Sequence, residues 1–177
     1  MKNLIMIAWF LSIFGIQACR TAKVPEDRPT LSFQKLDRKL QGLLQFSVPL
    51  IGAEQLFEKQ DQMLILDARE PEEYALSHLP NARAVGFKHF EVTQLSDVPK
   101  STPITVYCSV GYRSEKVGEM LQKEGFTKVY NLYGSIFDWA EKGYPLEDQN
   151  GKMTTLLHTY NQRWSQLVKN KQVEKKW

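Results

Sequence analysis

The chain has 177 residues, of which 42% are hydrophobic and 24% are charged. This is enough apolar material for one globular domain with its own core and short extensions, which we expect to be monomeric. The formal net charge of +3 is too small to indicate a nucleic-acid partner or electrostatic attachment to a membrane. A solvated C-terminal tail is predicted from four lysines: Lys169, Lys171, Lys175 and Lys176.

The N-terminus has the pattern of an export signal. Lys2 precedes an apolar run from Leu4 to Ala18, which is shorter than the roughly 20 residues that a membrane-spanning helix needs. Residues 16–19, Ile-Gln-Ala-Cys, resemble the lipobox of bacterial lipoproteins, which implies that Cys19 receives lipid. We therefore expect a signal peptide over residues 1–19, a tether over residues 20–30, and an exported protein in the periplasm or cell envelope. Ordinary cleavage that leaves Cys19 unmodified is the alternative.

The first half of the chain predicts short helices and strands in alternation. Leucines at near-helical spacing place an amphipathic helix within residues 31–47. Buried strands are expected where short apolar runs occur, and helices where apolar residues recur at helical spacing or proline precedes acids. The elements are a strand over 47–51, a helix over 53–59, a strand over 63–66, a helix over 71–77 and a strand over 84–86.

The second half continues the alternation. It predicts a helical turn over 92–95, a central strand over 104–107, a helix over 113–124, a strand over 128–132 and a helix over 136–142. Strands that alternate with helices indicate an α/β fold with a largely parallel sheet, covered by helices on both faces. We assign residues 48–146 to this domain and residues 147–177 to an extension with a last helix over 160–168, in which Trp164 packs into the core.

The cysteines point to a reactive site. Cys19 and Cys108 are the only two in the chain, and the first is assigned to processing. Cys108 is therefore either a buried apolar residue or a residue kept for its reactivity.

Cys108 follows a predicted strand and opens a loop that leads into a helix near Arg113. Such a loop turns backbone N–H groups toward a common centre, where the helix N-terminus adds about half a positive charge. This field binds anions and favours a cysteine thiolate over the thiol. Gly111 allows the backbone to curl, and Arg113 adds a permanent charge. The alternative is an inert buried cysteine with Arg113 in a surface ion pair.

The motifs around this loop resemble those of the rhodanese family. They fall in the order of that family and cover Val48 to Leu146: Leu66-Asp67-Ala68-Arg69, Glu73-Tyr74, Ser77-His78-Leu79-Pro80-Asn81-Ala82, the loop Cys108 to Arg113, and Tyr133-Gly134-Ser135-Ile136 with Trp139. The resemblance implies a five-stranded, mainly parallel sheet flanked by helices. It also implies sulfur transfer without a cofactor from a small sulfur-containing anion, such as thiosulfate, a persulfide or a thiosulfonate, to cyanide or a thiol, through a persulfide on Cys108.

The expected site residues follow from this reading. Cys108 is the nucleophile, and the amides of residues 109–113 form the cradle for sulfur and oxyanion: Ser109, Val110, Gly111, Tyr112 and Arg113. Asp67 and Arg69 are expected to pair at a strand end and fix the loop beneath Cys108, with Ser114 in support. The three histidines, His78, His89 and His158, are not spaced as metal ligands, so no metal is expected.

Two other functions stay open. The related phosphatase and arsenate-reductase loops have seven residues from cysteine to arginine, whereas Arg113 closes this loop at the sixth residue. A smaller ring of donors suits a sulfur atom better than a phosphate, which ranks that chemistry last. A low-turnover carrier that delivers persulfide to a partner protein is the second alternative. Ser109 and Val110 stand where thiosulfate-preferring members of the family often have basic residues, which leaves the donor open.

Overall fold

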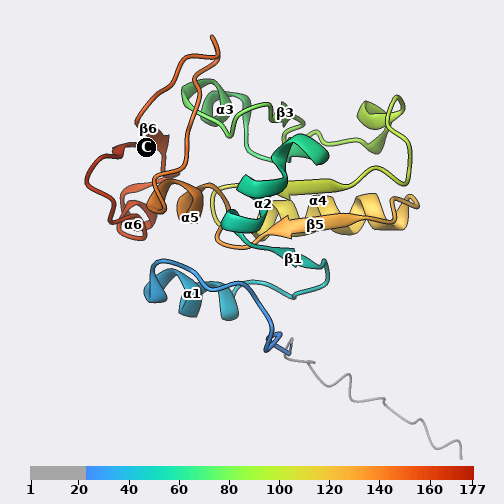
Figure 1. Ribbon diagram of the computed structural model, residues 1–177, viewed down its shortest axis with the longest axis horizontal. Coiled ribbons are helices and arrows are strands. Elements are labelled where there is room, and N and C mark those ends of the chain that lie inside the picture. Colours follow the sequence, from blue (N-terminus) through green and yellow to red (C-terminus); the bar gives the residue numbers. More distant parts are fainter. Residues whose placement is uncertain (1–22) are drawn as a thin grey trace, which may run out of the picture.

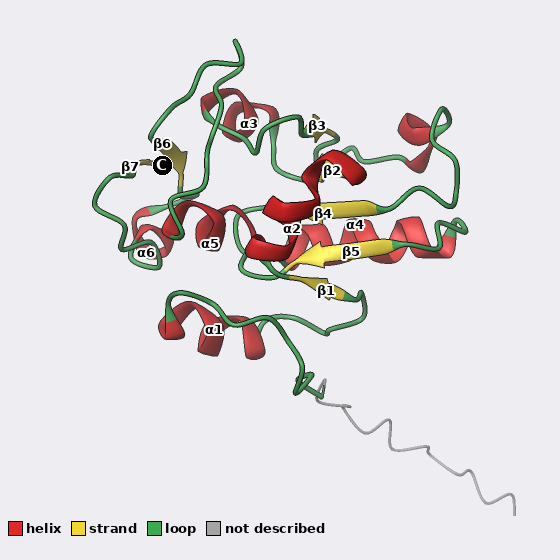
Figure 2. Ribbon diagram, in the orientation of Figure 1, coloured by secondary structure: helices red, strands yellow, loops and turns green. Residues whose placement is uncertain are grey.

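The computed structural model describes residues 23–177, and its centre is a five-stranded sheet (Figures 1 and 2). The strands are β1 (Leu50–Ile51), β2 (Leu64–Asp67), β3 (Arg83–Ala84), β4 (Ile104–Tyr107) and β5 (Val129–Leu132). They lie in the order β1-β5-β4-β2-β3, and every neighbouring pair is parallel. The predicted α/β class and parallel sheet are confirmed.

Most of the helices lie close to the positions that the sequence predicts. They are α1 (Gln34–Gln41), α2 (Ala53–Lys59), α3 (Pro71–Leu76), α4 (Tyr112–Lys123), α5 (Ser135–Glu141) and α6 (Gln162–Ser165), with 3-10 turns at η1 (Gln60–Gln62) and η2 (Val92–Leu95). Glu70 and Glu73 form a capping box around Pro71, which explains why α3 begins there. Gly125, in the left-handed conformation with φ of +90°, follows the C-cap of α4.

The sheet separates two hydrophobic cores, because successive residues of a strand point to opposite faces. Ile65 and Tyr107 belong to the core that contains α1, α2 and α5, whereas Leu66 and Val106 belong to the core beneath α4 and η2. Both faces are therefore covered, as the unbroken apolar strands predict.

The N-terminal segment packs on the domain. Leu36 and Leu40 of α1 are buried in the first core, and the Glu115 carboxylate of α4 accepts the N–H groups of Gln45 and Ser47. Arg28, in the region predicted as a tether, forms an ion pair of 2.9 Å with Asp37. The predicted signal peptide and Cys19 lie outside the described residues. Within residues 23–177, no helix combines the length and the apolar character needed to cross a membrane.

The C-terminal segment differs from its prediction. The expected helix over 160–168 is wrong in extent, because Tyr160 is left-handed with φ of +65° and Asn161 is extended, so that α6 begins only at Gln162. Three of the four lysines predicted to be solvated, Lys169, Lys171 and Lys176, are exposed, but residues 174–176 also form β7, which pairs in parallel with β6 (Leu156–His158). Lys175 donates to the carbonyl oxygens of Ser165 and Val168. Trp164 is half-buried against the core rather than enclosed by it.

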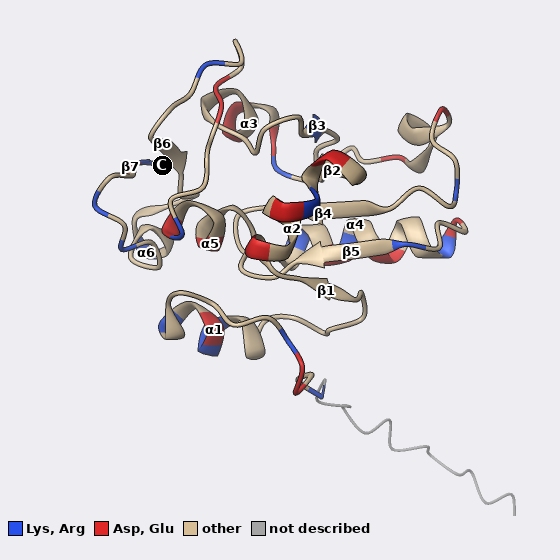
Figure 3. Cartoon of the chain, viewed as in Figure 1, with Lys and Arg blue, Asp and Glu red and all other residues tan. Residues whose placement is uncertain are grey.

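Charged residues are mixed over the described chain. Lys and Arg are interspersed with Asp and Glu along the helices and loops and do not gather over one element (Figure 3). This distribution agrees with the small net charge.

Candidate functional site

Cys108 lies directly beyond the carboxyl end of β4, the middle strand of the sheet, and is 1% exposed. The loop that it opens leads into the N-terminus of α4. The Gly111 N–H donates to Cys108 Sγ at an N to S distance of 3.1 Å. Gly111 reaches this position with φ of +119°, a backbone conformation that glycine adopts without strain. The predicted curl of the loop around the sulfur is present.

Polar side chains from β5 and α5 hold the loop. Asn131 donates to the Gly111 carbonyl oxygen (3.0 Å) and accepts from the Ser114 hydroxyl (2.7 Å). Ser135 Oγ accepts the Cys108 N–H at 3.1 Å. Ser114 therefore has the supporting position predicted for it, whereas Asn131 and Ser135 were not expected as positioning residues. Their roles depend on neighbouring strands meeting at one edge of the sheet, which residue patterns alone do not identify.

Opposing effects set the pKa of the Cys108 thiol. Burial raises it, but the charge of Arg113 and the N–H groups of Ser114, Gly111 and Val110 outweigh burial and hold the pKa below that of a free thiol. Ser114 thus acts on the sulfur although it lies just outside the predicted cradle. The roles predicted for the amides of Ser109 and Tyr112 toward a bound sulfur stay predictions.

Arg113 makes a bidentate ion pair with Glu73 of α3. Its two terminal nitrogens lie 2.5 and 2.8 Å from the Glu73 carboxylate oxygens, and one also donates to Ser109 Oγ at 2.9 Å. Burial raises the pKa of Glu73, but Arg113 and the Glu70 N–H lower it more, to about 2. Arg113 is therefore neither a surface residue nor a free cation, because a buried carboxylate shares its charge.

Glu73 was not predicted as a site residue. The sequence indicated only its place among the acids after Pro71 at a predicted helix start and in the Glu73-Tyr74 motif. Glu73 and Arg113 lie 40 positions apart in the chain, so no local pattern indicates the pair.

Asp67 and Arg69 form the predicted pair, fully buried at 2.6 Å. Asp67 also accepts from the Tyr107 hydroxyl (2.5 Å), and Arg69 donates to the Ser77 carbonyl oxygen (2.6 Å). The pair thus ties the end of β2 to Tyr107, the residue before Cys108, and to the end of α3.

A cavity of about 600 Å³ opens on Cys108. It is lined by the following residues: Leu43, Glu70, Glu72, Glu73, Phe87, Lys88, Cys108, Ser109, Val110, Tyr112, Arg113, His158, Tyr160 and Trp164. All the predicted loop residues except Gly111 line it. The last three residues come from the C-terminal segment and were not predicted in the site. A larger hollow of about 830 Å³, beside Arg28 and Lys142, lies away from Cys108.

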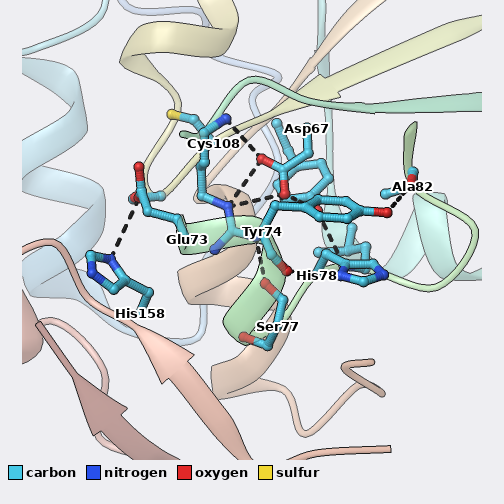
Figure 4. Close-up of polar contacts among 12 residues, drawn as sticks. Asp67, Glu73, Tyr74, Ser77, His78, Ala82, Cys108 and His158 are labelled. Carbon is cyan, nitrogen blue, oxygen red and sulfur yellow. Dashed lines mark hydrogen bonds and ion pairs between the residues drawn. The ribbon is translucent and has the colours of Figure 1, made fainter. Parts of the chain in front are cut away.

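His158 is the histidine of this site. Its Nδ1 lies 3.7 Å from the Glu73 carboxylate, toward which the ring points (Figure 4). His78 is buried elsewhere, with its Nδ1 at 3.0 Å from the Tyr74 carbonyl oxygen. Within residues 23–177, no group of three or more histidine, cysteine or acidic side chains is arranged to hold a metal ion.

Comparison with known proteins bears on this site. The family model described as "Rhodanese-like domain" matches residues 52–142, half of the chain. The chain belongs to the rhodanese-like domain family. The matched region contains Cys108, its whole loop, Glu73 and Arg113, but it excludes Leu43, His158, Tyr160 and Trp164.

Individual relatives of this rhodanese-like protein have different names. A "Sulfurtransferase" of Allochromatium vinosum is 32% identical over 51% of this chain and 84% of its own length. A "tRNA uridine(34) hydroxylase" of the Aster yellows witches'-broom phytoplasma is 35% identical over 64% of this chain but only 38% of its own length.

Among solved structures, the rhodanese-like domain of an Anabaena protein matches with a TM-score of 0.53. It is 27% identical and covers 56% of this chain and 79% of that one.

Proposed function

We propose that this protein is a sulfurtransferase that carries sulfur as a persulfide on Cys108. The observation that supports this most directly is the Cys108 sulfur, held at 3.1 Å by the Gly111 N–H at the end of a central parallel strand and facing a cavity. The family and the name of the Allochromatium relative agree with this chemistry. The donor we propose is thiosulfate or a related persulfide or thiosulfonate.

In the first half-reaction the Cys108 thiolate attacks the outer sulfur of the donor. With thiosulfate, a new S–S bond forms to Cys108, the S–S bond of the donor breaks, and sulfite leaves with the electron pair. The same groups that lower the pKa of the thiol, Arg113 and the backbone N–H groups of the loop, then stabilise the anionic persulfide.

In the second half-reaction an acceptor removes the outer sulfur. Cyanide or a thiolate attacks it, the S–S bond breaks, and Cys108 returns as a thiolate while thiocyanate or an acceptor persulfide leaves. Storage of the sulfur on the protein predicts ping-pong kinetics.

The ion pair between Arg113 and Glu73 disfavours phosphatase or arsenate-reductase chemistry. Both terminal nitrogens of Arg113 donate to the Glu73 carboxylate. They are therefore not free to donate to two oxygens of a tetrahedral oxyanion.

Mass spectrometry of the intact protein after incubation with thiosulfate tests the proposal. We expect a gain of about 32 Da, reversed by cyanide and absent in Cys108→Ala. Repeated release of thiocyanate indicates an enzyme, whereas one equivalent per chain indicates the carrier alternative. No gain from thiosulfate, an aryl thiosulfonate or polysulfide would contradict both.

We also propose export with lipid attached at Cys19, on the evidence of the apolar run over residues 4–18. The mass of the mature protein from a bacterial host tests this. A chain that begins at Cys19 with added lipid supports it, whereas an uncleaved chain contradicts it.

A further inference from the structure

The cavity at Cys108 has one side that the family region does not supply. We call His158, Tyr160 and Trp164 the C-terminal wall. All three lie beyond residue 142, where the match to the family ends, and all three line the cavity that contains the Cys108 sulfur. This wall is therefore a feature of this chain added to a common sulfur site.

Tyr160 is held in an unusual conformation at this wall. It is 60% exposed, and its backbone is left-handed with φ of +65°, which side chains other than glycine and asparagine rarely adopt. Its N–H donates to His158 Nδ1 at 3.3 Å, and its ring lies 6.0 Å from the Arg113 guanidinium. A large exposed aromatic side chain in a strained backbone beside a nucleophile is typical of a ligand contact.

The wall is fixed to the rest of the molecule. Thr159 is buried, and both its N–H and its hydroxyl donate to the Lys176 carbonyl oxygen in β7. Trp164 donates its backbone N–H to Asn161 Oδ1, and the Lys39 ammonium of α1 lies 5.7 Å from the Trp164 ring. The N-terminal helix α1 and the C-terminal segment are therefore in contact next to the cavity.

The size and charge of the cavity argue against a small inorganic anion as the only occupant. About 600 Å³ is typical of sites for organic ligands. Three carboxylates, those of Glu70, Glu72 and Glu73, line it with two cations, Lys88 and Arg113, and the second cation is already paired. Away from the sulfur cradle, the cavity thus offers aromatic and apolar contact without excess positive charge.

We propose that the C-terminal wall binds the apolar body of an organic thiol that accepts sulfur from the Cys108 persulfide. This inference rests on the proposed function and names its acceptor class. The acceptor thiolate attacks the outer sulfur, a new S–S bond forms, the bond to Cys108 breaks, and the organic persulfide leaves while Cys108 keeps the electron pair.

The experiment distinguishes binding of the acceptor at the C-terminal wall from the reactivity of the persulfide in the sulfur cradle. Full-length protein is loaded with inorganic polysulfide, its persulfide is verified by mass, and single-turnover discharge is followed with benzyl mercaptan, 2-mercaptoethanol and cyanide. Wild type should discharge to benzyl mercaptan with saturation and faster than to 2-mercaptoethanol. Tyr160→Asn, which keeps a residue tolerant of the left-handed backbone, should lower the ratio of benzyl mercaptan to cyanide rate constants by about tenfold.

Two variants serve as controls. Tyr160→Phe keeps the ring and should retain the wild-type ratio, and Trp177→Ala changes an exposed aromatic residue of the same segment that does not line the cavity. An unchanged ratio in Tyr160→Asn, or equal losses with all three acceptors, would overturn the inference while leaving the proposed function intact. A wild-type protein that accepts no persulfide from any donor would overturn both.

Discussion

At the scale of single residues, the chemistry depends on a balance at the Cys108 sulfur. Burial opposes a thiolate, whereas Arg113 and three backbone N–H groups favour it. Glu73 weakens the help from Arg113, because its carboxylate neutralises part of the guanidinium charge at 2.5 Å. The net effect lowers the pKa of the Cys108 thiol, through a guanidinium and backbone N–H groups that the fold itself supplies.

This balance predicts the pH dependence of alkylation. Because the pKa of Cys108 is lowered, the thiolate should persist as pH falls below the pKa of a free thiol, and iodoacetamide should react faster at pH 7 than with a simple thiol of the same exposure. Arg113→Gln removes the cation and leaves Glu73 unpaired, so the pKa should rise and the rate at pH 7 should fall by about tenfold. The measurement is the alkylation rate from pH 5 to pH 10.

Two further variants control this prediction. Glu73→Gln removes the competing carboxylate and should move the titration of Cys108 in the opposite direction, to lower pH. Arg83→Gln breaks an exposed pair with Asp97 remote from the cavity and should change nothing. A titration of Cys108 at or above the pH of a free thiol in wild type would refute the assignment of a reactive thiolate.

At the scale of elements, the junction between β4 and α4 makes the site. The strand delivers Cys108 to the edge of the sheet, and the helix begins at Tyr112 with Gly111 as its N-cap. At φ of +119°, Gly111 can aim its N–H at the sulfur, and a Cβ there would meet no atom closer than 3.5 Å. The requirement for glycine is therefore one of backbone conformation and not of space.

Substitution at the two ends of α4 separates stability from function. Gly111→Ala and Gly125→Ala both place alanine at a positive φ, so each should lower the free energy of unfolding by about 1–2 kcal/mol. Of these two variants, only Gly111→Ala should also slow alkylation and persulfide formation, because Gly111, unlike Gly125, donates its N–H to Sγ. Urea unfolding and alkylation rates measure the two effects. Equal alkylation rates in both variants would contradict the role of the Gly111 N–H.

At the scale of the whole molecule, segments outside the family region are part of the folded unit. Leu157, Leu167 and Val168 are buried in the same core as α1, α2 and α5. The segment that carries the C-terminal wall is thus packed as a continuation of the domain.

This packing predicts a large loss of stability on truncating a C-terminal side chain. Leu157 is fully buried, so Leu157→Ala should lower the free energy of unfolding by roughly 2–4 kcal/mol. Met153→Ala, at a side chain 67% exposed in the same segment, should change it by less than about 0.5 kcal/mol. Denaturant unfolding measures both. A similar small effect in both variants would show that the segment is not part of the cooperative core.

The sequence by itself determined most elements of the α/β domain and singled out Cys108 as the predicted nucleophile. Short apolar runs, proline and glycine positions and a lone cysteine before a helix are local features, so β2, β4, α2, α4 and the loop from Cys108 to Arg113 could be located without a structure. The pair of Asp67 and Arg69 was also predictable, because its members lie only two positions apart in the chain.

Only the tertiary structure decided what surrounds the sulfur. Glu73 reaches Arg113 across 40 positions of the chain, Asn131 reaches Gly111 across 20, and the C-terminal wall comes from beyond the family region. Such contacts depend on the order of the strands in the sheet and on where the C-terminal segment packs. Hydrophobic periodicity and local propensity predict neither of these. The charge partner of Arg113 and the shape of the cavity are therefore products of the fold as a whole.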